Sequence, residues 1–187
     1  MEMAKAAVFL TTGYEETEAL ATADILRRAG IETVLVSLAG EKTVSGGHKI
    51  AVLADAFFNV TDLPRFDLLV LPGGQVVEGY KAHAGLKKAV EAHVKAGKLV
   101  GAICAAPTYL AWLGLLKEKT AVCYPAMAEK LAEAGAVWGG GNVAADGTLV
   151  TSQGPATTPF FALELAARLV GKETAEKTGK AFLIDII

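Results

Sequence analysis

A strand that ends at Cys104 and passes almost at once into a helix constrains this chain more than any other stretch. Residues 99–103 form an apolar run with the length and composition of a buried strand. The Ala-rich stretch 105–113 favours a helix, and Pro107 is tolerated in a first helical turn. Small residues flank the cysteine on both sides, as the sharp turn of a nucleophile elbow requires. The stretch therefore predicts a cysteine at a strand-to-helix corner.

Two interpretations of Cys104 follow from this position. At the start of a helix, the positive end of the helix dipole would lower the pKa of the thiol and raise its thiolate fraction. Alternatively, Cys104 is a small apolar residue packed beneath a sheet, because free cysteine is among the most buried residue types. The local sequence favours neither interpretation, so the rest of the chain has to decide.

The rest of the chain alternates strands and helices in the order of a parallel sheet. An apolar strand at 6–10, a helix at 15–28 and a strand at 33–37 form a βαβ unit. The periodicity predicts the remaining elements as a hairpin within 44–53, strands at 66–71, 99–103 and 120–124, helices at 84–96, 105–113, 126–134 and 157–170, and a hairpin within 143–151. We therefore expect one α/β domain over residues 1–187, with helices on both faces of a mostly parallel sheet.

Three of these strands end in residues that could carry chemistry. They are followed by residues 11–18, by Pro72-Gly73-Gly74 and by Cys104. Parallel strands bring their carboxyl ends to one edge of the sheet, where ligands bind in α/β proteins. We therefore expect these three segments to converge on one candidate site.

Glu18 and two backbone amides are the candidates for acting on Cys104. A partly desolvated Glu18 would either stay protonated and donate a hydrogen bond to a thiolate, or accept a proton as a general base. The N–H groups of Gly74 and Ala105 would converge on an oxyanion beside the sulfur. Glu15 and Glu16 are explained more simply as acidic residues that complement a helix N-terminus.

Cys123 and Tyr124 follow the strand after the elbow helix and are weaker candidates. Cys123 would serve as a resolving thiol for an oxidised Cys104, and Tyr124 would donate a hydrogen bond to a substrate. Plain packing is the favoured interpretation of both. None of the three histidines has a position that suggests pairing with the thiol.

Composition and missing motifs exclude several classes of function. A net charge of −2 without a concentrated basic face argues against nucleic-acid binding, and no apolar run is long enough to span a membrane. Two cysteines without C-x-x-C spacing form no zinc signature, and no Gly-rich nucleotide motif occurs. We therefore expect no metal and no organic cofactor. The N-terminus shows no export signal, which makes the cytoplasm the default.

Five motifs in a fixed order resemble the signatures of the DJ-one/ThiJ/PfpI superfamily, and the DJ-one branch is the most similar. They are Gly13-Tyr-Glu-Glu-Thr-Glu18, Arg27-Arg-Ala-Gly-Ile31, Val70-Leu-Pro-Gly-Gly74, Ala102-Ile-Cys-Ala-Ala-Pro107 and Thr151-Ser-Gln-Gly-Pro155. The resemblance implies a flavodoxin-like three-layer α/β sandwich that is usually a homodimer. It places the family's nucleophilic, oxidation-sensitive cysteine on Cys104, its hydrogen-bonding glutamate on Glu18 and its oxyanion-type amides on Gly74 and Ala105.

Several positions depart from the pattern of the DJ-one branch. Tyr124 stands where that branch often carries His before the proline, and Gln153 replaces an arginine in Ser-Arg-Gly-Pro. His48 stands where an arginine often reaches the neighbouring subunit's site, whereas Arg28 matches. Ala105 replaces the histidine of the PfpI protease branch, which argues against peptidase activity. The residues expected to line the site or contact substrate are Glu15, Gly73, Tyr124, Cys123, His48, Arg28, Gln153 and Pro155.

The resemblance implies a cysteine-dependent enzyme that acts on reactive dicarbonyls or their adducts, of the glutathione-independent glyoxalase or deglycase type. Its expected partners are a small aldehyde or dicarbonyl substrate and a second copy of the chain. The alternative is a redox sensor or redox-regulated chaperone, in which Cys104 is oxidised to sulfinate. An amidohydrolase using the same elbow is a third interpretation, weakened by the absence of a histidine after Cys104.

Overall fold

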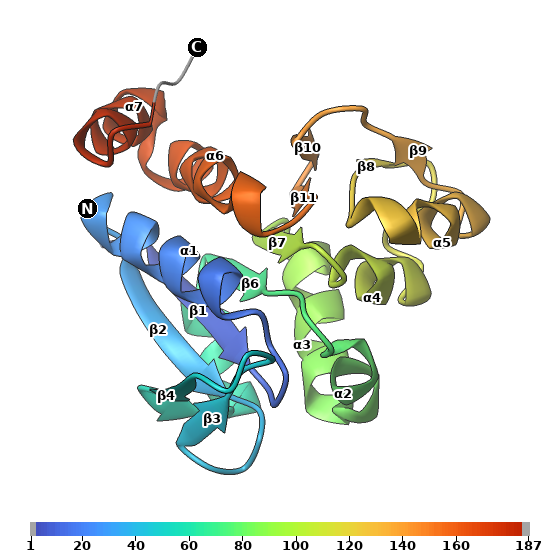
Figure 1. Cartoon of the computed structure of the whole chain (residues 1–187), viewed down its shortest axis with the longest axis horizontal. Helices are drawn as coiled ribbons and strands as arrows, with labels where there is room; N and C mark the ends of the chain where they lie inside the picture. The colour runs from blue at the N-terminus through green and yellow to red at the C-terminus, as the bar shows by residue number, and fades with distance from the viewer. Residues whose placement is uncertain (1–2, 185–187) are drawn as a thin grey trace.

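A mostly parallel sheet forms the centre of the computed structural model, which describes residues 3–184. Its strands are β1 (Lys5–Leu10), β2 (Glu32–Ser37), β5 (Ala56–Phe57), β6 (Leu68–Leu71), β7 (Leu99–Ile103), β10 (Val143–Asp146) and β11 (Leu149–Ser152). They lie in the order β10-β11-β7-β6-β1-β2-β5 (Figure 1). Neighbours pair in parallel except at one edge, where β10 runs antiparallel to β11. The predicted mostly parallel α/β sheet is confirmed.

Helices cover both faces of this sheet. On one face, α6 (Thr158–Val170) packs against β7, β11 and the first helix, α1 (Glu16–Arg28), and α7 (Lys172–Ala181) packs against α6. On the other face, α3 (Ala84–Lys95) packs against β7 and the 3-10 helix η1 (Val60–Arg65). The shorter helices are α2 (Val77–Ala82), α4 (Pro107–Trp112), α5 (Ala128–Glu133) and the 3-10 helices η2 (Pro125–Met127) and η3 (Pro155–Thr157). This arrangement is the expected flavodoxin-like three-layer sandwich.

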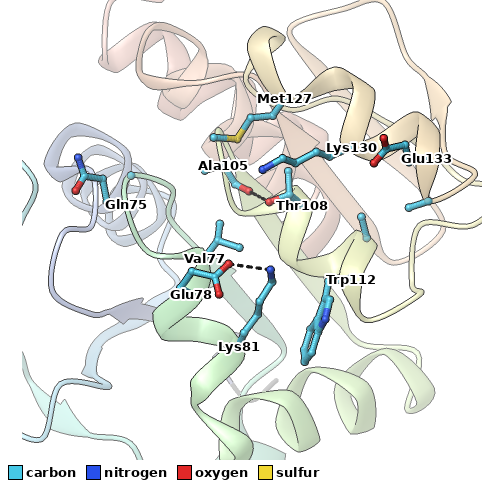
Figure 2. A pocket seen from close by; sticks show the side chains of 13 residues that line it. Gln75, Val77, Glu78, Lys81, Ala105, Thr108, Trp112, Met127, Lys130 and Glu133 are labelled. Carbon is cyan, nitrogen blue, oxygen red and sulfur yellow. Dashed lines mark hydrogen bonds and ion pairs between the residues drawn. The ribbon is translucent and has the colours of Figure 1, made fainter.

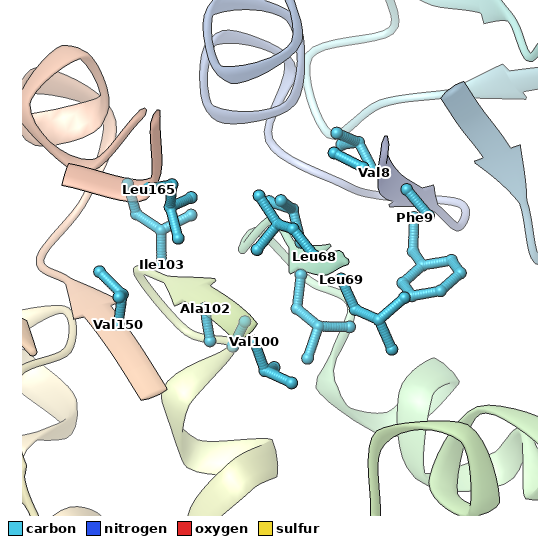
Figure 3. Close-up of a cluster of buried hydrophobic side chains, with 14 of the residues drawn as sticks. Val8, Phe9, Leu68, Leu69, Val100, Ala102, Ile103, Val150 and Leu165 are labelled. Atoms are coloured by element: carbon cyan, nitrogen blue, oxygen red, sulfur yellow. The ribbon is translucent and has the colours of Figure 1, made fainter. Parts of the chain in front are cut away.

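The central strands are apolar throughout because both of their faces are buried. All four residues of β6 are fully buried, and β1 is buried from Ala6 to Leu10. Figure 3 shows side chains of successive residues leaving the sheet on opposite sides, with Ile103 toward Leu165 of α6 and Ala102 away from it. Strands covered on both faces need continuous apolar runs rather than alternation, which is why the sequence pattern located them well.

Two small sheets lie outside the central one. The expected hairpin is β3 (Thr43–Ser45) and β4 (Ala51–Leu53), which pair antiparallel. The strand predicted at 120–124 is wrong in extent: only β8 (Thr120–Ala121) forms, and it pairs with β9 (Val137–Trp138) instead of joining the central sheet. The chain leaves β8 early because the N–H of Tyr124 donates to the carbonyl oxygen of Cys104 at 2.8 Å.

Two α-helices are absent from the sequence prediction. The helix α7 is rich in charged residues, and α2 is only six residues long, so neither shows a clear apolar period. In the described part of the chain, no helix has the length and apolar character needed to cross a membrane.

Gly101 in the middle of β7 lets α6 approach the sheet. A Cβ atom at this position would lie 2.8 Å from Cζ of Phe161 and 3.0 Å from Cδ1 of Leu165. Both side chains belong to the buried core, so neither can move into solvent.

Gly101→Ala is therefore expected to lower the free energy of unfolding by about 1–3 kcal/mol, the usual cost of overpacking a core. Urea denaturation of the variant and the native protein measures the change. Adding Phe161→Leu to Gly101→Ala should recover part of the loss, because the shorter side chain makes room for the new methyl group. Equal stability of native protein and Gly101→Ala would contradict this packing.

Candidate active site

The candidate site lies where the strand order of the central sheet reverses. From β1 the chain continues to β2 and β5 on one side, and the later strands β6, β7 and β11 lie on the other. The loops after β1 and β6 meet at this switch point: Tyr14 pairs with Gly74 across a β-bridge, and the N–H of Glu15 donates to the carbonyl of Gly73 at 2.9 Å. This is where α/β sheets bind ligands.

Cys104 forms the elbow at the end of β7, the strand next to β6. Its φ of 62° lies in the left-handed region that side chains other than glycine rarely adopt. Hydrogen bonds to two further segments hold this backbone: the N–H of Cys104 donates to the carbonyl of Ser152 at the end of β11 at 2.9 Å, and the carbonyl of Cys104 accepts from the N–H of Tyr124 at 2.8 Å. Helix α4 begins only at Pro107, after an intervening turn. The predicted strand-to-helix corner is confirmed.

Gly73 is the point at which Cys104 and Glu18 come together. A Cβ atom on Gly73 would lie 2.6 Å from the Cβ of Cys104 and 2.8 Å from Oε2 of Glu18. The N–H of Gly73 donates to Oε2 of Glu18 at 2.7 Å. The Glu18 side chain is fully buried, and its other oxygen, Oε1, makes no hydrogen bond of ordinary geometry within residues 3–184. A buried carboxyl group with one uncommitted oxygen therefore lies beside the cysteine.

Glu18 and Cys104 shift each other's ionisation. Burial raises the pKa of Glu18 to about 7, against the lowering effects of the Gly73 N–H and the Cys104 thiol. Burial and the negative charge of an ionised Glu18 raise the pKa of the Cys104 thiol to about 12, while the N–H groups of Gly74 and Ala105 act to lower it. The first of the two interpretations of Cys104, a thiol pKa lowered by a helix dipole, is therefore wrong. Helix α4 has only six residues and starts beyond the turn that contains the sulfur.

The two groups together hold one negative charge near neutral pH. Each resists ionisation beside the charge of the other, so they titrate as a pair. When Glu18 takes up a proton, its charge no longer opposes a thiolate on Cys104, and the amide N–H groups still favour one. Transfer of a single proton from sulfur to carboxylate therefore converts the pair into its nucleophilic form.

The amides of Gly74 and Ala105 are free to act on this sulfur. Neither N–H has a backbone acceptor within the described residues, and both lower the pKa of the thiol. Gly74 has a φ of 98°, and a Cβ atom there would collide with the carbonyl oxygen of Gly13. Only glycine therefore allows this close approach. Both N–H groups therefore act on the sulfur, and their role toward a substrate oxyanion stays a prediction.

Glu15, Glu16 and His48 lie together at the start of α1. Oε2 of Glu15 accepts from the N–H of Glu18 at 2.7 Å, which confirms the expected helix cap. Glu16 does not cap the helix. It is buried and accepts hydrogen bonds from the N–H groups of His48 and Ile50 and from Nδ1 of His48, so it anchors the β3–β4 hairpin. The ligand atoms of the two glutamates and His48 lie within 4.8 Å of one another, but these hydrogen bonds already engage both oxygens of Glu16.

The remaining sequence candidates differ in their contacts, and one of them bonds to the backbone of Cys104. Tyr124 is adjacent through its hydrogen bond to Cys104, and Gly154, between Gln153 and Pro155, approaches the Tyr124 ring. The side chain of Gln153 donates to the carbonyl of Gly141. Cys123 is buried, and burial raises the pKa of its thiol to about 11. Arg28 does not join the site within one chain, because it lies at the opposite end of α1, paired with Asp24.

Comparison with known proteins agrees with this geometry. Residues 4–168 match the DJ-1/PfpI family. The chain belongs to the DJ-1/PfpI family. It is 36% identical to "Protein dj-1beta" of Drosophila melanogaster over 184 residues, which cover 97% of this chain and 98% of the relative. The crystal structure of Drosophila melanogaster DJ-1beta superposes with a TM-score of 0.92 at 34% identity, covering 99% of this chain and 100% of that one. "Glutathione-independent glyoxalase DJR-1.2" of Caenorhabditis elegans is 30% identical over 159 residues, covering 85% of this chain and 84% of the relative.

A cavity of about 680 Å³ opens beside the two amides in this member of the DJ-1/PfpI family (Figure 2). Gly74 and Ala105 form part of its wall, and the hydroxyl of Thr108 donates to the carbonyl of Ala105 at 2.7 Å. Lys81 of α2 and Lys130 of α5 also line it. The sequence gives no sign of these lysines, because α2 shows no clear apolar period and no motif marks a lysine on a short helix.

Alkylation of Cys104 tests the shared charge in a Cys123→Ser background. Because the thiolate forms by proton transfer within the pair, the alkylation rate should rise with pH through the first ionisation of the pair, at or below about 7, and then level off. An ordinary thiol would show this step near 8.5. Rates of iodoacetamide labelling, followed by intact mass, measure the profile, and Cys104→Ser identifies the labelled site. A labelling rate that rises in a single step, at a pH above the pKa of an ordinary thiol, would contradict the shared charge.

Proposed function

We propose that this chain is a cysteine-dependent enzyme that converts reactive dicarbonyls, such as methylglyoxal, to hydroxy acids without glutathione. The observation that carries the proposal is the buried Glu18 carboxyl, raised to a pKa of about 7, beside the nucleophile Cys104. A general base or acid works best with a pKa near the operating pH. A buried carboxyl group with an uncommitted oxygen is costly to the fold, and a proton-transfer role explains it. The relative from Caenorhabditis elegans, named as a glutathione-independent glyoxalase, supports the same chemistry.

The first half of the reaction forms a hemithioacetal. The Glu18 carboxylate accepts the proton of the Cys104 thiol as the sulfur adds to the aldehyde carbon of methylglyoxal. The N–H groups of Gly74 and Ala105 stabilise the negative charge that develops on the aldehyde oxygen. That oxygen then takes the proton back from Glu18, which leaves Glu18 ionised again and ready to act a second time.

The second half moves a proton between neighbouring carbons. Glu18 removes the proton from the carbon bound to sulfur, giving an enediolate, and returns it to the adjacent carbon, while the hydroxyl proton of the hemithioacetal passes to the oxygen of that adjacent carbon. The product is a lactoyl thioester on Cys104, and the oxidation of one carbon balances the reduction of the other. Water hydrolyses the thioester, releasing lactate and restoring the thiol. An adduct of a dicarbonyl that releases its aldehyde would be attacked by Cys104 in the same way and would form the same hemithioacetal.

The expected setting of this activity is a homodimer in the cytoplasm, with neither a metal nor an organic cofactor in the reaction. His48, Tyr124 and Gln153 replace residues typical of the DJ-one branch, so we expect them to change the range of substrates. None of them takes part in the proton transfers proposed for Cys104 and Glu18.

Conversion of methylglyoxal to lactate, measured without glutathione, tests the mechanism. Cys104→Ser should abolish turnover, and Glu18→Gln should lower it by roughly 100-fold or more, because general acid–base catalysis contributes about 10²–10⁴. Cys123→Ser, which removes the other thiol, is the matched control and should keep most of the activity. Lactate formation at equal rates by native protein, Cys104→Ser and Glu18→Gln would refute the mechanism.

Oxidation of Cys104 to a sulfinate is the competing function, and one observation favours it. Cys104 is partly exposed, and the donors that would hold an oxyanion would also hold sulfinate oxygens. Mild peroxide followed by intact mass separates the two functions. A gain of two oxygens confined to Cys104, together with no turnover of dicarbonyls, would favour the sensor.

A further inference from the structure

The cavity beside the amides is much larger than methylglyoxal requires. Its volume of about 680 Å³ lies within the range of roughly 300–1,000 Å³ that is typical of sites for larger ligands. Gly74 and Ala105 form its wall nearest the nucleophile, and Val77, Trp112 and Met127 give it apolar surface. A small dicarbonyl bound to Cys104 would leave most of this space to water. The space is therefore suited to a substituent carried by the substrate.

The charges around the cavity indicate what this substituent would be. Lys81 is neutralised by Glu78, whose Oε1 lies 2.8 Å from its ammonium nitrogen. Lys130 forms no ion pair in the part of the chain that the structure describes. Figure 2 shows its side chain extending toward Ala105 and Thr108, away from the Glu133 carboxylate. Lys130 therefore directs an unpaired positive charge toward the end of the cavity formed by Ala105 and Thr108. Glu133, the other charged lining residue without an ion pair among the described residues, lies on the opposite side of the Lys130 ammonium from these two residues.

We propose that the cavity selects dicarbonyls that carry an anionic group a few bonds from the reacting carbon, with Lys130 as the residue that binds this group. The inference rests on the proposed function, because it takes Cys104 as the attacking nucleophile. The ammonium of Lys130 meets the anion, and the apolar wall formed by Val77, Met127 and Trp112 contacts the intervening carbon atoms. Lys81 is a weaker candidate for binding the anionic group, because its ammonium already forms an ion pair with Glu78.

Two probes of matched shape test this selectivity. The acid probe is methylglyoxal extended at its methyl carbon by an acetate group (4,5-dioxopentanoate), and the amide probe is its primary amide. The readout is the ratio of kcat/KM for acid over amide. We expect the native protein to prefer the acid by roughly fivefold, the upper end for an exposed ion pair. Added salt should reduce this preference, because salt screens exposed charges.

Variants at Lys130 assign the preference to one residue. Lys130→Met should bring the acid-to-amide ratio to about one, and Lys130→Arg should retain most of the native ratio. Lys95→Met is the matched control, because it removes the same charge from an exposed position of α3 that does not line the cavity. It should leave the ratio at its native value.

The outcomes separate this inference from the proposed function. Absence of turnover for methylglyoxal and both probes would refute the proposed function. Turnover with equal kcat/KM for acid and amide would leave that function intact and overturn the anionic subsite. A native preference that Lys130→Met and Lys95→Met reduce equally would also overturn it, because the effect would then come from overall charge.

Discussion

Burial of the Glu18 carboxyl group beside Cys104 is the constraint on which the rest of the site depends. In water the two groups would ionise independently, but at the sheet edge burial and mutual repulsion allow them one negative charge between them. The cost of burying Glu18 is partly offset by the Gly73 N–H, which donates to Oε2 at 2.7 Å. The other oxygen keeps its capacity to exchange a proton. A fold that satisfied both oxygens would be more stable and chemically inert.

The segments around Glu18 and Cys104 bring their backbone N–H and carbonyl groups close to these two side chains. Gly73 and Gly74 have no side chains that would separate the β6 loop from Cys104 or from the β1 loop. Tyr80 also holds the turn at Pro72-Gly73-Gly74, because its hydroxyl donates to the carbonyl of Pro72 at 2.8 Å. On the other side, Ser152 and Tyr124 hold the backbone of Cys104 in its left-handed conformation. Residues from four separate segments therefore support the positions of one sulfur and one carboxyl group.

Sequence reasoning located the elbow, the convergence of strand ends and Glu18, because each leaves a local pattern: an apolar run, a glycine pair or an acidic first turn. It failed where the outcome depends on tertiary contacts. The local sequence could not decide the pKa of Cys104, because burial and the Glu18 charge outweigh a short helix that starts beyond the sulfur. Glu16 lies in the first turn of α1 as expected, yet its carboxylate also binds a hairpin more than thirty residues away, which no local pattern shows. Lys130 lies on a short helix without a motif, and only the fold shows that its side chain extends toward Ala105 in the wall of the cavity.

The most direct measurement is the protonation state of Glu18 itself, read from the carboxyl stretching band in isotope-edited infrared difference spectra of native protein and Glu18→Gln. Our account predicts that the protonated carboxyl band persists into the neutral range and disappears around a pH of about 7. Cys104→Ser, which removes the thiol partner, should shift that transition. A band already lost near the ordinary glutamate pKa of about 4.3, and unaffected by Cys104→Ser, would show that no charge is shared and would contradict the account.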